Sequence, residues 1–235
     1  MDRRIARLGA VLLAGGVLLF GAASLLHPPT ASPWEPVEAL AEATRPLWLV
    51  DHAVLLLAMV ALHLGLFLLH ARITAVQAAP LSQAAYALGV TSLTLWVAVF
   101  VLELTGWRAL AEAAKEWFGH SSAMPPPRVV GPAGTMSLLV HSLWATAISL
   151  GYAAAFLLSL AVLLWSTDMR RSRDRSFPAW AGSLGIAAAL TNLIALPVAF
   201  AIPRIALWLL IPAAGLLGAW LLAAAWLLWL TPASP

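Results

Sequence analysis

Imidazole and carboxylate groups are the side chains of this sequence most able to do chemistry. The 235 residues include six histidines and ten acidic residues but no cysteine. Iron–sulfur clusters, disulfides and thiolate zinc sites are therefore excluded, and a metal would have to be held by His, Asp, Glu or Met. The sequence also has no phosphate-binding glycine loop, nucleophile elbow, paired catalytic carboxylate motif or His-Glu-x-x-His pattern. Any site must be assembled by tertiary structure.

His52 and His141 are the predicted centre of such a site. Each lies in a long apolar stretch, and both stretches are expected to run from the outer to the inner side of a membrane, which gives the two histidines similar depths. Two imidazoles on facing helices are the usual ligands of a b-type haem held in a helix bundle. The sequence thus predicts at most one haem b, bound by His52 and His141.

A copper, zinc or iron ion near the outer surface is the alternative to haem. Imidazole and carboxylate ligands suit all three ions. The expected ligands are His52 and His141, together with side chains that could approach the same region, namely His27, His120, Asp51 and Glu103.

A third interpretation is that no cofactor is bound. Each histidine would then lie at an interface or make a hydrogen bond between helices. His63 is expected near the middle of the membrane, where an imidazole needs a partner, and Thr91 or Thr94 is the expected one. Otherwise His63 belongs to a proton path with Tyr152 and Glu103.

Glu103 has several expected roles besides metal binding. It lies near the outer end of an apolar stretch and five residues before Arg108. Glu103 is expected to pair with Arg108, to reach outward to water, or to accept a proton.

Composition predicts that these residues are positioned by an all-α integral membrane protein. Hydrophobic residues make up 62% of the chain and charged residues 10%, and the mean hydropathy is +0.91. Thirteen basic residues against ten acidic ones is too small an excess to indicate a nucleic-acid partner. The predicted partner is the lipid bilayer, crossed by about six helices at 5–26, 46–70, 82–104, 136–165, 177–201 and 205–230.

The arginines predict the orientation of the chain. Arg3, Arg4 and Arg7 precede the first span, Arg72 follows the second, and a further cluster lies in the loop 166–176. Because short cytoplasmic loops carry an excess of Lys and Arg, both termini are expected to be cytoplasmic, in an inner or plasma membrane.

The two predicted outer loops, 27–45 and 105–135, contain helical signals. In the first, Ser32, Pro33 and Glu35 form a capping box that should open a short helix ending before Pro46. In the second, apolar residues recur at helical spacing from Trp107, which predicts an amphipathic helix. The last hairpin is expected to turn at Pro203 and Arg204.

A weak internal repeat suggests how the spans are grouped. When His52 is aligned with His141, Phe67 falls on Phe156. A true duplication would make helices two to five a central four-helix unit, flanked by helices one and six.

These observations predict an electron-transfer unit or an accessory subunit of a respiratory complex, rather than a stand-alone enzyme. A quinone or other membrane subunits are the expected partners. The alternative is a small-solute transporter or a structural membrane subunit without a cofactor.

Overall fold

The computed structural model describes residues 2–27, 36–76, 79–118, 132–172 and 177–230, and the chain is helical nearly throughout these ranges. Six helices are long and apolar enough to cross a membrane. They are α1 (Arg3–Leu26), α3 (Pro46–Val76), α4 (Pro80–Val101), α6 (Pro132–Arg171), α7 (Ala179–Ala201) and α8 (Ala206–Trp229). Shorter elements are α2 (Pro36–Ala43), the π-helix η1 (Leu102–Trp107), α5 (Arg108–Phe118) and the 3-10 helix η2 (Pro203–Ile205).

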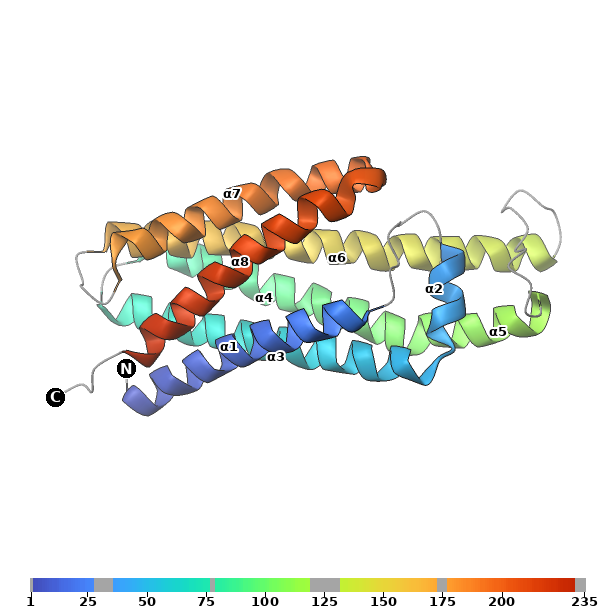
Figure 1. The fold of residues 1–235 in the computed structure, drawn as a ribbon, viewed down its shortest axis with the longest axis horizontal. Coiled ribbons are helices and arrows are strands. Elements are labelled where there is room, and N and C mark those ends of the chain that lie inside the picture. The colour runs from blue at the N-terminus through green and yellow to red at the C-terminus, as the bar shows by residue number, and fades with distance from the viewer. Residues whose placement is uncertain (1, 28–35, 77–78, 119–131, 173–176, 231–235) are drawn as a thin grey trace.

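The six long helices form one closed ring in chain order. Each packs against the helices before and after it, and α8 returns to pack against α1 (Figure 1). A separate four-helix unit is therefore not found, because α1 and α8 complete the same ring. Glycines bring α1 close to α3: a Cβ on Gly16 would lie 2.9 Å from the backbone nitrogen of Leu62. Only glycine permits this approach of the two backbones.

The two ends of the ring differ in charge. One end, called here the arginine end, holds the start of α1 and the ends of α3, α6 and α8 (Figure 1). The arginine side chains at this end belong to Arg3, Arg4, Arg7, Arg72, Arg170 and Arg171. The first and last helices meet here, since the Arg7 guanidinium lies 5.0 Å from the ring centre of Trp229. The opposite end is called the site end.

Several helices extend at the site end beyond the turn between α7 and α8 (Figure 1). The 40 residues of α6 span about 60 Å, roughly twice the apolar thickness of a bilayer. A cluster of buried residues, called the cap cluster, holds these extensions together with α2; its members are Ala39, Ala43, Trp48, Trp107, Ala111, Ala114, Val140 and Trp144. The Trp107 indole donates a hydrogen bond to the Ala39 carbonyl, at 3.4 Å.

The long helices overlap the predicted spans, but α3 and α6 run on to Val76 and Arg171, beyond the predicted ends at 70 and 165. The predicted capping box of Ser32, Pro33 and Glu35 lies outside the described residues. The short helix before Pro46 is present as α2, the amphipathic helix from Trp107 is present as α5, and the last turn falls at Pro203 and Arg204. The second outer loop is shorter than predicted, because η1 continues α4 directly into α5. Helical structure therefore reaches Phe118.

Candidate metal centre

Three elements bring two histidines and two carboxylates together at the site end. His27 is the C-cap residue of α1, Asp51 and His52 lie in the second turn of α3, and Glu103 lies in η1. The antiparallel contact of α1 with α3 sets this register: Gly16 lies opposite Leu62, so the end of α1 arrives beside the start of α3.

The distances between these groups are close to those around a bound metal ion. Ligand atoms of His27, Asp51 and His52 all lie within 4.8 Å of one another. Asp51 Oδ2 is 3.9 Å from His27 Nε2 and 3.6 Å from His52 Nδ1, and His52 Nε2 is 3.4 Å from Glu103 Oε2. Metal–ligand bonds of about 2.0–2.2 Å in a tetrahedron place ligand atoms about 3.3–3.6 Å apart. Because His52 Nδ1 also contacts the Trp48 carbonyl, an ion would bind at Nε2 beside Glu103, and His27 and Asp51 would have to move toward that nitrogen to complete the site.

The Asp51 carboxylate is the least satisfied member of the group. Asp51 is 4% exposed, and neither of its oxygens has a hydrogen-bond partner among the residues that the structure describes. Burying a carboxylate without such partners costs several kcal/mol. A cation between Asp51 and the neighbouring imidazoles would offset this cost.

His52 is held in a fixed orientation by its own helix. Its Nδ1 lies 2.9 Å from the Trp48 carbonyl oxygen, which only accepts hydrogen bonds, so Nδ1 carries the donated proton. Nε2 is then the nitrogen with a free lone pair. Metal-binding histidines commonly donate their other ring nitrogen to a carbonyl in this way. The Trp48 indole stacks on the imidazole at 3.9 Å between ring centres, and its Nε1 donates to the Glu103 carbonyl at 3.4 Å.

No match to this chain is found among models of known protein families, curated proteins or solved structures. The function is therefore argued from the geometry of the site.

The structure does not bring His141 to His52. A Cβ on Gly106 would lie 3.7 Å from Leu143, so His141 lies roughly 7 Å beyond Glu103 toward the cap cluster. His141 Nδ1 instead bonds to the Ser137 carbonyl of its own helix, at 2.8 Å. His120 lies outside the described residues. Of the six predicted ligands, the structure thus gathers His27, Asp51, His52 and Glu103.

His63 is buried among three helices. The residue is fully buried; its Nδ1 lies 2.8 Å from the Met59 carbonyl and its Nε2 lies 3.2 Å from Ser92 Oγ. Ser92 Oγ in turn donates to the Ala154 carbonyl of α6, at 2.9 Å. This network links α3, α4 and α6.

Two predicted partnerships are wrong. Thr91 and Thr94 do not bind His63, because their hydroxyls are on the exposed side of α4 and donate to carbonyls of that helix. Glu103 does not pair with Arg108, because η1 turns Glu103 toward His52. Arg108 pairs with Glu112 one turn further along α5, at 3.1 Å.

The three residues of the predicted proton path contact different partners in the described structure. Tyr152 packs against Phe200 of α7, with ring centres 5.2 Å apart, whereas His63 bonds to Ser92 and Glu103 contacts His52.

Sequence reasoning missed the π-helix that carries Glu103. A π-helix adds one residue to a turn and often occurs at functional sites. The only signal in the sequence is Gly106 beside Thr105, whose hydroxyl donates back to the Val101 carbonyl at 2.6 Å. Sequence reasoning also missed the roles of Ser92 and of Trp48.

Proposed function

We propose that this protein crosses a membrane with six helices and binds one transition-metal ion at the site end. His27, Asp51 and His52 supply the ligands, and Glu103 is the fourth. The observation that carries the proposal is the buried Asp51 carboxylate, which has no hydrogen-bond partner in the described parts of the chain and whose Oδ2 lies 3.9 Å from His27 Nε2 and 3.6 Å from His52 Nδ1.

Zinc, iron or copper suits this ligand set better than haem does. The set contains imidazole nitrogens and carboxylate oxygens but no sulfur, and zinc, iron and copper ions all bind such nitrogen and oxygen ligands. A haem iron bound to His52 Nε2 would have to occupy the space of Glu103 Oε2, only 3.4 Å from that nitrogen.

Burial of the site favours electron transfer over turnover of a substrate at the metal. His52 is 1% exposed and Asp51 is 4% exposed, while the His27 side chain is 25% exposed. An electron needs little opening, and the Trp48 ring lies directly against His52. We therefore favour an electron-transfer unit if the ion is iron or copper; zinc has no redox chemistry and would instead have a structural role in an accessory subunit of a membrane complex.

The arginine end is proposed to be cytoplasmic. Six described arginines gather there in short segments, as expected for the inner side of a membrane. Both ends of the chain would then be cytoplasmic, in an inner or plasma membrane, and the metal site would lie near the outer surface.

Elemental analysis of the purified protein, followed by titration of the metal-free form with cobalt(II), tests the metal proposal. We expect about one ion per chain and visible cobalt bands, both lost on His52→Ala or His27→Ala. His141→Ala is the matched control, because this histidine lies outside the site and should leave metal binding unchanged.

If the protein binds haem through His52 and His141, the His141→Ala variant loses its cofactor. A Soret band in the wild-type protein that disappears on His141→Ala would establish a bis-histidine haem and overturn the metal proposal. Protein that binds neither metal nor haem would favour a cofactor-free subunit or a transporter. The four side chains would then serve to hold α1, α3 and η1 together.

A further inference from the structure

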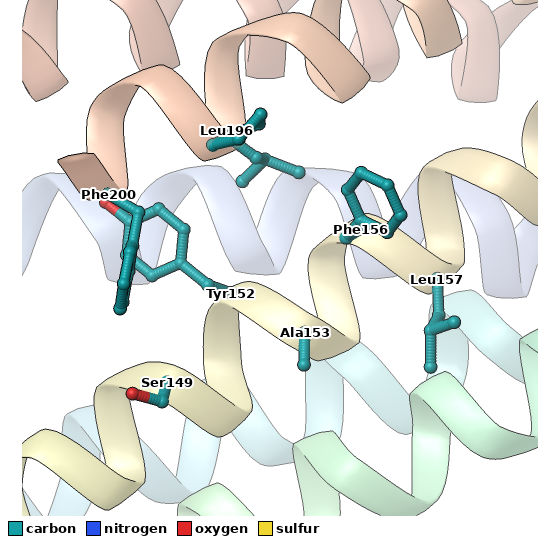
Figure 2. Close-up of a pocket in the computed structure, with 8 residues that line it drawn as sticks. Ser149, Tyr152, Ala153, Phe156, Leu157, Leu196 and Phe200 are labelled. Atoms are coloured by element: carbon teal, nitrogen blue, oxygen red, sulfur yellow. The ribbon is translucent and has the colours of Figure 1, made fainter.

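An open pocket of about 430 Å³, called here the cavity, lies on the surface between α6 and α7, away from the candidate metal centre (Figure 2). Eight residues line it, and only Ser149 and Tyr152 carry hydroxyl groups. The others are apolar and include Phe156, Leu196 and Phe200. The volume falls in the range of small-molecule sites. We propose that this cavity binds a prenylated quinone, independently of the metal.

The two hydroxyls are free to donate to a ligand. In the part of the chain that the structure describes, neither the Tyr152 hydroxyl nor the Ser149 hydroxyl has a hydrogen-bond partner. Thr146 and Ser159 of the same helix, by contrast, donate to carbonyls one turn earlier. A hydroxyl in apolar surroundings without a partner is unfavourable, so the cavity calls for a ligand that accepts hydrogen bonds.

Polar and apolar parts of the cavity are separated along the helices. Figure 2 shows the oxygens of Ser149 and Tyr152 at the end marked by Phe200, with Phe156 and Leu157 at the other end. Phe200 is the second-last residue of α7, so the hydroxyls lie near the site-end limit of the α7–α8 hairpin. A bound amphiphile would place its polar part near the membrane surface and its apolar tail toward the middle.

A quinone matches this arrangement better than a phospholipid does. Its two carbonyl oxygens accept hydrogen bonds, and its flat ring can pack against aromatic rings such as Tyr152 and Phe200. No charged residue lines the cavity to hold a phosphate group. A simple acyl chain would leave both hydroxyls without an acceptor. The Tyr152 and Ser149 hydroxyls would thus hold the carbonyls, and Phe156 would contact the start of the tail.

Equilibrium binding of a benzoquinone with a ten-carbon tail to the full chain in lipid nanodiscs tests the proposal. We expect saturable binding of about one molecule per chain. Tyr152→Phe keeps the ring but removes one donor and should weaken binding about tenfold. Thr146→Ala is the matched control, because this hydroxyl is already bonded to the Ser142 carbonyl. Ala153→Trp, at an exposed position, should fill the cavity and abolish binding.

The same measurement with decylbenzene distinguishes a quinone site from a lipid groove. Decylbenzene has the tail and a ring but no carbonyl oxygens, so it should bind at least tenfold more weakly than the quinone. Equal binding of the two probes, or no effect of Tyr152→Phe, would overturn the proposal, as would the absence of saturable binding. His52→Ala should leave quinone binding unchanged, which separates this proposal from that of the metal centre.

Discussion

Asp51 and Asp168 are equally buried aspartates with opposite surroundings, and replacing each by asparagine separates a functional carboxylate from a structural one. Both are 4% exposed. Asp168 Oδ2 accepts a hydrogen bond from the Ser82 backbone nitrogen at 2.7 Å and so caps the first turn of α4. The Asp51 oxygens have no hydrogen-bond partner. The two substitutions are therefore expected to change stability in different directions.

The magnitudes follow from what each carboxylate contacts. Loss of a buried charged group without partners removes a penalty of about 1–3 kcal/mol, so Asp51→Asn should leave the metal-free protein as stable as the wild type or raise its stability by up to that amount. Asparagine can still accept the Ser82 hydrogen bond but lacks the negative charge that favours a helix N-terminus by about 0.3–1 kcal/mol, so Asp168→Asn should lower stability by about that amount. Zinc at a hundred times its Kd should stabilise the wild type by about 2.7 kcal/mol. Asp168→Asn should keep this gain and Asp51→Asn should lose most of it.

Unfolding of the three proteins in detergent, with a chelator and with excess zinc, measures these differences. Metal-dependent stabilisation that is the same in all three proteins would show that Asp51 is not a ligand. A loss of stability on Asp51→Asn without metal, as large as that on Asp168→Asn, would show that its contacts with the two histidines are structural. Either result refutes the reasoning from burial and missing partners.

Two further predictions concern the packing of the ring. Gly16→Ala should lower the free energy of unfolding by about 1–3 kcal/mol, because the added Cβ would meet the α3 backbone. Gly15→Ala is the control and should be neutral or slightly stabilising, since nothing lies within 4 Å of that position. Equal effects of the two substitutions in thermal unfolding would contradict the close contact between α1 and α3. His63→Ala and Ser92→Ala should each destabilise the protein by about 1–3 kcal/mol. A double-mutant cycle should show a coupling energy of at least about 0.5 kcal/mol between the two residues. Additive effects would show that the 3.2 Å contact between His63 Nε2 and Ser92 Oγ contributes nothing to stability.

The spans and their order along the chain could be predicted because they depend on local sequence. Apolar runs, prolines and capping residues fix where helices begin and end whatever their neighbours are. The short helix before Pro46 and the turn at Pro203 were therefore correct to within a few residues. The start of the second outer loop was predicted incorrectly, because the π-helix η1 that continues α4 into α5 has no strong sequence signal.

The candidate site could be predicted only in part. His27, Asp51, His52 and Glu103 were recognised as residues able to bind a metal, and the structure brings them together. The sequence could not test the expected pairing of His52 with His141, because the depth of each residue in the membrane was judged from the limits of the predicted spans alone. α6 extends well beyond the α7–α8 turn (Figure 1), and Val140 and Trp144, which flank His141 on that helix, belong to the cap cluster.

The sequence by itself determined that six apolar helices form and which residue types are available for chemistry, because helix formation and hydrophobicity are properties of short segments. The tertiary structure alone decided that the helices close into a ring, that Gly16 sets α1 against α3, and that η1 turns Glu103 toward His52. These outcomes depend on contacts between residues far apart in the chain. The placement of two imidazoles beside the buried Asp51 carboxylate belongs to this second group.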